Sequence, residues 1–159
     1  MDAFDVKLLA TLQQDSSLSI NDVAERIGLS PTPCWRRIKR LEEEGYIRKR
    51  VAILDPIKLG LSLTAFVLIK TDRHNHEWLE RFRSAVAKFP EVVEIARLAG
   101  EYDYLLKVIT RNNQTYDAFY KRLIAEVELS NVTSSFSMED IKSVTELPLE
   151  FAGLGDAAV

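Results

Sequence analysis

The sequence predicts an α+β protein in which an N-terminal helix-turn-helix domain is joined by a short strand and linker to a C-terminal ferredoxin-like βαββαβ domain. Three amphipathic helical segments follow one another closely within residues 1–45, and later segments alternate between strand-like and helix-like patterns. The 159 residues suffice for two small domains. We expect residues 1–60 to form the first domain, residues 61–150 the second and residues 151–159 a flexible tail.

The composition excludes several classes of protein. No apolar run approaches the roughly 18 residues that span a bilayer, so we expect no membrane partner. The first residues include Asp2 and Asp5 and lack a basic start before an apolar core, which argues against a signal peptide and for a cytoplasmic location. Cys34 is the only cysteine, which excludes an intramolecular disulfide and a cysteine-rich zinc site.

Local capping signals define the first two helices. Asp2 is a suitable N-cap for a helix over residues 3–14, whose apolar residues fall at helical spacing. Ser19 and Asp22 resemble a capping box at the start of the second helix. Gly28 is expected to end that helix as a C-cap glycine.

The third helix has the features of a recognition helix. Ser30 is its candidate N-cap, Pro31 suits the first helical position, and Gly45 is expected to follow its end. Its outward face is small and basic, and double-stranded DNA is the expected partner because such helices direct their N-terminal residues to base edges. The candidate DNA-binding residues lie on this helix and in the segment after it: Ser30, Thr32, Pro33, Arg36, Arg37, Lys39, Arg40, Arg48 and Arg50. The inward stripe consists of Cys34, Ile38 and Leu41.

Charge is distributed unevenly along the chain. The net charge is −3, yet residues 1–60 carry a net charge of +1, and seven of the fifteen residues in the span 36–50 are lysine or arginine. Such a stretch can contact phosphates locally, although a solvated helix face with Arg/Lys–Glu pairs is an equally good interpretation of the charges alone. Trp35 lies at the side of the helix, where we expect it to pack at the edge of the domain rather than stack on a base.

Residues 46–54 favour a strand, because Tyr46, Val51 and Ile53 are good strand formers. We expect the lysine and arginine side chains of this segment to contact a flanking DNA phosphate, as the wing of a winged helix-turn-helix does. Asp55–Pro56 is expected to end the strand, and Gly60 completes a short linker.

The remaining residues predict the ferredoxin-like domain. The expected strands cover residues 62–71, 92–99, 104–110 and 131–145, and the expected helices cover residues 76–88 and 115–127. Both helices of this fold lie on one face of the sheet, so the other face needs a partner. A homodimer with its sheets face to face is the natural solution.

The chain offers little that could perform catalysis. His74 and His76 are the only histidines, and an i,i+2 pair in a loop is weak evidence for a metal site. No nucleophile, base and oxyanion hole are assembled by spacing, so we expect neither an enzyme nor a cofactor. The 100–103 hairpin is more site-like, because its glycine and two acids suit an amino-acid zwitterion. A tight turn capped by Asp103 is the alternative.

Three stretches of the chain resemble the leucine-responsive/asparagine-regulator (Lrp/AsnC) family of bacterial and archaeal transcription factors. They are SPTPCWRRIKRLEEEGYIRKRVAILDPIKLGL, AGEYDYLLKV and VTSSFSMEDIKSVTELPL, and the resemblance covers about residues 2–149. It implies a helix-turn-helix followed by a ferredoxin-like effector domain, dimers that assemble into tetramers or octamers, and amino-acid effectors bound near the contacts between dimers. The stretches TPCWRRIKRLE, AFVLIKT, GEYDYL and VTSSFSME are similar to a subgroup that responds to cysteine.

The resemblance also implies roles for individual residues. It places the recognition helix over residues 30–40. It assigns to the effector pocket the hairpin residues and one residue of the last strand: Gly100, Glu101, Tyr102, Asp103 and Ser134. Val132 stands where members of the family often have Thr, and Trp35 where Leu is usual.

Three hypotheses follow for the function. The leading one is a sequence-specific DNA-binding transcriptional regulator controlled by a small amino-acid-type effector. The second is an effector-independent architectural DNA-binding protein of the same fold. The third is an amino-acid-metabolising enzyme on a ferredoxin-like domain, against which the missing catalytic constellation argues.

Overall fold

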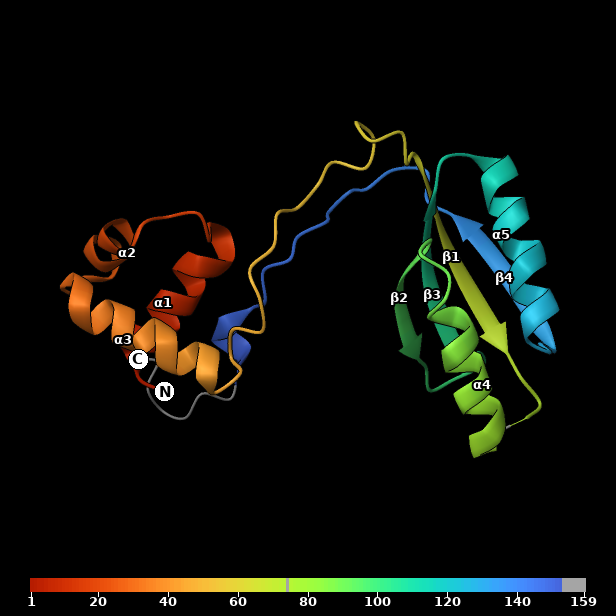
Figure 1. Cartoon of the computed structure of the whole chain (residues 1–159), viewed down its shortest axis with the longest axis horizontal. Helices are drawn as coiled ribbons and strands as arrows, with labels where there is room; N and C mark the ends of the chain where they lie inside the picture. The colour runs from red at the N-terminus through yellow and green to blue at the C-terminus, as the bar shows by residue number, and fades with distance from the viewer. Residues whose placement is uncertain (74, 153–159) are drawn as a thin grey trace. The chain divides into compact units, whose positions relative to one another are not determined.

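The computed structural model describes residues 1–73 and 75–152, which fall into two compact units (Figure 1). The first unit combines residues 1–53 with the segment that begins at Lys142, and the second extends from Leu54 to Ile141. The chain therefore returns to its N-terminal unit after completing the second, whereas the sequence predicts one passage from residues 1–60 to residues 61–150. Among the described residues, no helix has the length and apolar character that crossing a bilayer requires.

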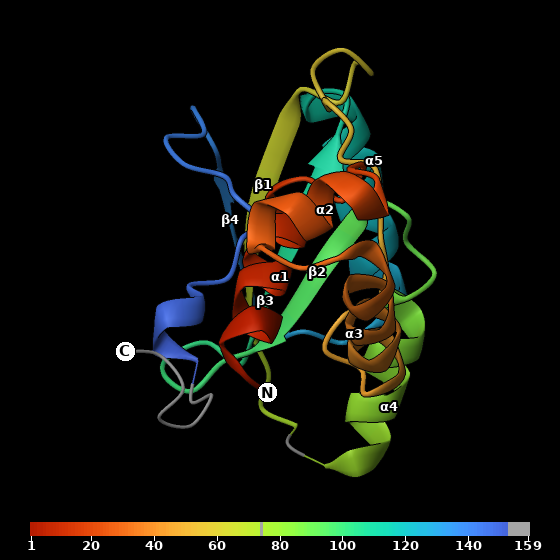
Figure 2. The ribbon, with the colours of Figure 1, turned by 90° about the vertical axis from the view of Figure 1, so that its left-hand side faces the viewer.

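The first unit contains three helices, α1 (Ala3–Gln14), α2 (Ile20–Ile27) and α3 (Pro31–Glu43), and Figure 2 shows them from one side. The predicted caps of the first two helices are confirmed. Asp2 and Ser19 each form a reciprocal capping box with the residue three positions later. Gly28 adopts φ +75°, which L side chains rarely adopt, and ends α2 with its N–H bonded to the carbonyls of Ala24 and Glu25.

Helix α3 presents the predicted inward stripe to the core of this unit. Pro31 occupies the first turn, and Ser30 is the N-cap by backbone geometry although its side chain makes no capping hydrogen bond. Burial also raises the pKa of the Cys34 thiol, which agrees with a structural role. The core of the unit consists of Leu8, Leu12, Val23, Ala24, Ile27, Cys34, Ile38 and Leu41.

The strand predicted for residues 46–54 does not form within the described chain. The segment is irregular after α3, and Val51 and Ile53 are 58% and 73% exposed. A strand needs a neighbour that satisfies its N–H and C=O groups, and the sheet of the second unit pairs only its own four strands. Strand propensity without a partner therefore leaves this connection unpaired.

The segment that returns to the first unit is attached to α1. The Gln13 side-chain amide donates to the Leu147 carbonyl and accepts from the Leu147 N–H, both at 3.0 Å. A short 3-10 helix, Leu149–Phe151, follows and includes the first residue of the expected tail. Residues 153–159 of that expectation lie outside the described residues.

The second unit is the predicted ferredoxin-like domain. Its strands are β1 (Leu63–Lys70), β2 (Val92–Arg97), β3 (Tyr104–Thr110) and β4 (Asn131–Phe136), and its helices are α4 (His76–Val86) and α5 (Asn113–Glu126). The strands are antiparallel in the order β2-β3-β1-β4. The last strand ends at Phe136 rather than at residue 145.

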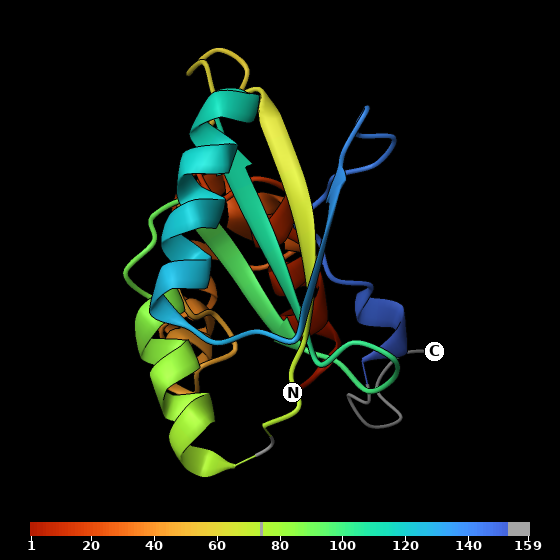
Figure 3. The same ribbon diagram turned by 90° about the vertical axis from the view of Figure 1, so that its right-hand side faces the viewer.

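Both helices of this unit cover one face of the sheet (Figure 3). Alternation along β1 and β3 directs Val67 and Leu106 into the core against Phe82 of α4 and Phe119 of α5. Within the described part of this unit, no helix covers the opposite face. Half-buried side chains occupy its central positions: Phe66, Leu68, Leu105, Lys107 and Ile109.

Candidate nucleic-acid interface and effector site

The outward face of α3 is accessible, as its helical spacing predicts. Thr32, Pro33, Arg36 and Lys39 are all exposed, while Cys34, Ile38 and Leu41 are buried on the other side of the helix. The N-terminal end of α3 carries no acidic residue in its first turn. This end of the helix is therefore compatible with an anionic partner such as DNA.

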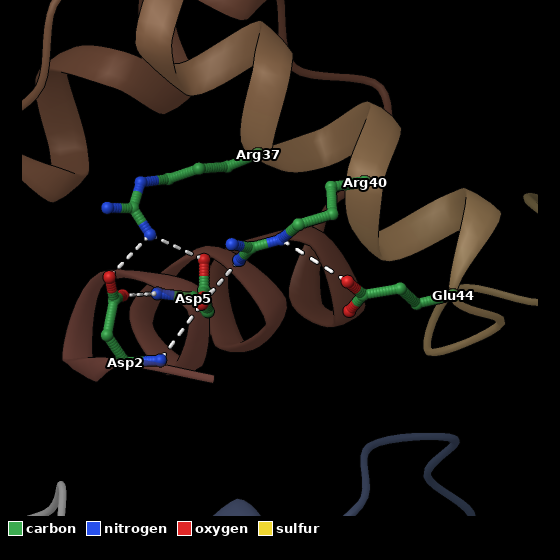
Figure 4. Close-up of polar contacts among 5 residues, drawn as sticks. All are labelled: Asp2, Asp5, Arg37, Arg40 and Glu44. Carbon is green, nitrogen blue, oxygen red and sulfur yellow. Dashed lines mark hydrogen bonds and ion pairs between the residues drawn. The ribbon is translucent and has the colours of Figure 1, made fainter.

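Two of the predicted DNA-binding arginines are bonded to α1 (Figure 4). Asp5 lies almost completely buried, with its side chain 1% exposed, between the two guanidinium groups. Arg37 donates to Asp5 Oδ1 and to Asp2 Oδ2, both at 2.7 Å, and Arg40 donates to Asp5 Oδ2 at 2.6 Å. Arg40 also lies 3.8 Å from Glu44. We call Asp2, Asp5, Arg37 and Arg40 the interhelix clamp.

The clamp stabilises its carboxylates in the charged form. Burial has the largest single effect on the pKa of Asp5 and raises it, but the hydrogen bonds from the Asp2 N–H and Arg37 and the charge of Arg40 outweigh burial. The pKa of Asp5 is therefore lowered. The pKa of Asp2 is lowered mainly by the hydrogen bond from the Asp5 N–H, and the pKa of Arg37 is raised by its hydrogen bonds to Asp5 and Asp2.

The other basic residues predicted to bind DNA fall into two groups according to whether they form ion pairs. Lys39 and Arg50 share Glu42, at 2.9 Å and 3.2 Å. Arg36 and Arg48 make no ion pair with any described carboxylate, and Arg36 is the one of these two that lies on α3. On α3, Thr32 and Arg36 are therefore exposed and without an ion pair to a described carboxylate, and Lys39 is exposed but paired with Glu42. Arg37 and Arg40 contribute to packing against α1.

Trp35 adjoins this accessible face. The sequence predicts that it packs at the edge of the domain, but 49% of the residue is exposed. Packing accounts for only half of its surface. The other tryptophan, Trp78, is 7% exposed, stacks on Phe82 at a centroid distance of 5.1 Å and donates its indole N–H to the Glu128 carbonyl.

The second predicted site is the hairpin between β2 and β3. Gly100 has φ +149°, in the region that favours glycine, and Glu101 is exposed. Asp103 supports the turn through both its backbone and its side chain. Its N–H donates to the Ile69 carbonyl at 2.9 Å, its carbonyl accepts from Leu98, and its carboxylate accepts from the Thr71 N–H at 2.8 Å.

The structure separates Ser134 from the other predicted effector residues. Strand register places Ser134 opposite Val67, on the helix-covered face, and its hydroxyl lies 2.5 Å from that of Tyr116 on α5. Thr133 points to the open face instead, where its hydroxyl lies 3.4 Å from that of Tyr102 in the hairpin. Thr133 is absent from the residues predicted for the effector site. The period-two alternation of the strand could have identified it.

A surface depression of about 240 Å³ flanks the same hairpin. It is lined by Arg73, Asn75, His76, Trp78, Leu79, Arg97 and Tyr104. None of the predicted effector residues lines it, so the hairpin and this depression are separate features. The other histidine of the metal hypothesis, His74, lies outside the described residues. Within residues 1–73 and 75–152, no three His, Cys, Asp or Glu side chains are arranged to hold a metal ion.

Comparison with known proteins finds a different family for each part of the chain. Residues 1–48 match the winged helix-turn-helix DNA-binding family, and residues 64–147 match the Lrp/AsnC ligand binding domain. The chain is 55% identical over 151 residues to the DNA-binding transcriptional activator DecR of Escherichia coli K12. This match covers 94% of the present chain and 99% of DecR. It is 46% identical over 149 residues to the glutamate uptake regulatory protein of Zymomonas mobilis, covering 94% and 91% of the two chains.

Solved structures show the same architecture. The crystal structure of an AsnC family transcriptional regulator from Agrobacterium tumefaciens matches with a TM-score of 0.92 and 53% identity, covering 96% of this chain and 99% of that one. A transcriptional regulator of Neisseria meningitidis in complex with L-Met matches with a TM-score of 0.90 and 36% identity, covering 94% and 97%. The chain belongs to the Lrp/AsnC family of transcriptional regulators.

Proposed function

We propose that this protein is a cytoplasmic transcriptional regulator, and not an enzyme, that binds double-stranded DNA through α3 and responds to an amino-acid effector bound by its second unit. The observation that carries the DNA-binding role is the accessible face of α3, on which Arg36 has no carboxylate partner among the described residues. The relative DecR is named a DNA-binding transcriptional activator, and the relative from Zymomonas mobilis is named a regulatory protein; both names support this proposal.

The effector is proposed to bind beside the turn of the β2–β3 hairpin, on the side where Tyr102 lies close to Thr133. The regulator of Neisseria meningitidis was crystallised with L-Met, which supports an amino acid as the class of ligand. The ammonium group would be held by the Asp103 carboxylate or a backbone carbonyl. The carboxylate group would be held by backbone N–H groups near Gly100 and by the hydroxyl of Thr133, which replaces Ser134 in this proposal.

A homodimer is the proposed minimum assembly, with tetramers or octamers built from it. The face of the sheet that bears no helix presents Phe66, Leu68 and Leu105, which a second copy would cover. A dimer also supplies two recognition helices, which suits two half-sites about one helical turn of DNA apart, or a multiple of that distance.

Effector binding is tested by a thermal-shift screen of the twenty amino acids, including cysteine, followed by titration of DNA with and without each hit. An effector present at 100 times its dissociation constant should raise the free energy of unfolding by about 2.7 kcal/mol. The same amino acid should change the affinity for DNA. If no amino acid shifts the unfolding temperature while DNA still binds, the architectural alternative is supported instead.

The location of the effector is tested with Asp103→Asn, which retains an oxygen that can accept from the Thr71 N–H. Loss of a charge-assisted hydrogen bond should weaken the effector by roughly tenfold to a hundredfold, equivalent to about 1.5–3 kcal/mol. The matched control is Asp117→Asn, because Asp117 is an exposed acid of the same unit that pairs with Lys121. Equal effector affinity in both variants and in the wild type would show that Asp103 only supports the turn.

A further inference from the structure

We propose that Trp35 reads thymine in the operator, through apolar contact between its exposed indole edge and the C5-methyl group of a thymine in the major groove. The inference rests on the proposed DNA-binding role of α3 and assigns to that helix a specificity residue besides Arg36. Half of Trp35 is exposed although it lies in a helix whose inward stripe is fully buried.

The position of Trp35 on the helix directs it toward the same partner as its polar neighbours. At 100° per residue, Trp35, Thr32 and Arg36 fall within one arc of about 100°. All three are exposed. Trp35 lies at the lateral edge of this arc, about 60° from the buried Ile38, and Thr32 and Arg36 lie on the side away from Cys34 and Leu41. An α-helix enters the major groove through such a face, so a side chain in this arc meets base edges when its neighbours do.

The chemistry of the indole selects one feature of the major groove. The thymine C5-methyl is the apolar group that base pairs present there, and the remaining positions are hydrogen-bond donors and acceptors. The bases of an intact duplex remain stacked, which leaves no base face on which the indole could stack. Contact with a methyl group removes apolar surface of both partners from water, a favourable change.

The surroundings of Trp35 favour DNA over a protein partner. The next residue, Arg36, has no carboxylate partner among the described residues, and the first turn of α3 bears no acid. DNA phosphates would neutralise the positive charge of this face of α3, and the counterions released from the DNA would increase the affinity of the protein for it. The contrast with Trp78, whose ring and N–H are both satisfied inside the second unit, shows that exposure is not general for tryptophan in this chain.

The test replaces thymine by deoxyuridine, which removes only the methyl group. A binding site is first selected from random duplex DNA with the wild-type protein, and each thymine of the site is then replaced in turn. Wild type, Trp35→Ala and Trp35→Gln are titrated against every duplex. Phe151→Ala is the matched control, because Phe151 is 82% exposed in the same unit but lies outside α3.

Replacement of one thymine in each half-site by deoxyuridine should weaken DNA binding by the wild type about fourfold. This is the loss in affinity expected when one buried methyl-sized group is removed. Both Trp35 variants should bind the unmodified site more weakly and show no further loss at that thymine, since coupled groups are not additive. Phe151→Ala should behave as the wild type does.

Two results would overturn the inference while leaving DNA binding intact. One is a wild type that tolerates every uracil replacement, and the other is a Trp35 variant that remains as sensitive as the wild type. If no DNA sequence is enriched by the wild type, the proposed DNA-binding function fails and the inference fails with it. Thermal unfolding of each variant identifies any loss of folding, and the polar Trp35→Gln variant decides the outcome if Trp35→Ala is unstable.

Discussion

At the scale of single residues, Asp5 and Asp22 occupy the same local position but have different surroundings. Each is the third residue of its helix and completes a capping box, with Asp2 and Ser19 respectively. Asp5 also accepts from Arg37 and Arg40 and is buried, whereas Asp22 is exposed. The pair therefore separates the contribution of the interhelix clamp from that of helix capping.

Replacement of Asp5 by Asn should lower the free energy of unfolding by about 1–3 kcal/mol, because it leaves two guanidinium groups without their shared charged acceptor. Partial exposure of Arg37 and Arg40, at 25% and 45% of their side chains, keeps the loss below that of a fully buried ion pair. Asp22→Asn should change stability by no more than about 0.5 kcal/mol. Urea unfolding measures both, and equal losses would mean that the clamp contributes nothing beyond capping.

The clamp should also make stability depend on pH. The pKa of Asp5 and that of Asp2 are lowered in the folded state, so their contribution is fully present above the unfolded-state pKa of about 3.9. It disappears as the pH falls through the lowered folded-state values. The difference in unfolding free energy between wild type and Asp5→Asn should therefore be constant near neutral pH and shrink below about pH 4. A difference that grows on acidification contradicts this assignment.

At the scale of elements, the two neighbouring hydroxyls of β4 have opposite roles because successive side chains of a strand point to opposite faces. Ser134 joins β4 to α5 through Tyr116, which is 7% exposed and whose pKa is raised, mainly by burial. Thr133 contacts Tyr102 on the open face. One residue therefore belongs to packing and its neighbour to the proposed effector site.

Ser134→Ala should lower the free energy of unfolding by about 1–3 kcal/mol, because it leaves the buried Tyr116 hydroxyl without a partner. Thr133→Ala should leave the free energy of unfolding nearly unchanged and lower the affinity for the effector. Chemical unfolding and calorimetry with the effector measure the two properties separately. Loss of effector affinity in Ser134→Ala at unchanged stability would restore Ser134 to the pocket that the family resemblance implies.

The elements could be predicted wherever the signal is local. Asp2, Ser19 and Gly28 mark the ends of helices by their own chemistry, and the alternating patterns of the second unit identify its four strands. Features that depend on distant residues could not be predicted. A helical projection of α3 places Arg40 outward because it contains no information on Asp5, which is 35 residues away in sequence. The missing strand at residues 46–54 has the same origin, since strand propensity does not supply a partner.

Assembly of the whole molecule should depend on the sheet face that α4 and α5 leave uncovered. Phe66→Asp places a charge at the centre of that face and should convert a dimer, with twice the 18.1 kDa of one chain, into a monomer. Ile124→Asp is the control, because Ile124 is 46% exposed but lies on α5, which covers the other face. Sedimentation at micromolar concentration distinguishes the two masses. A Phe66→Asp variant that sediments as the wild type does would place the interface elsewhere.

The proposed binding of DNA by the accessible face of α3 depends on Arg36. The dissociation constants of wild type and Arg36→Ala should be measured for a selected operator and for a scrambled duplex of equal length. If Arg36 reads a guanine edge, the operator affinity should fall by about 1–3 kcal/mol, or roughly fivefold to 150-fold, with little change for the scrambled duplex. If Arg36 contacts phosphate alone, both duplexes should weaken alike and the salt slope should fall by about one. Unchanged binding of both duplexes by Arg36→Ala would contradict the assignment of this face to DNA.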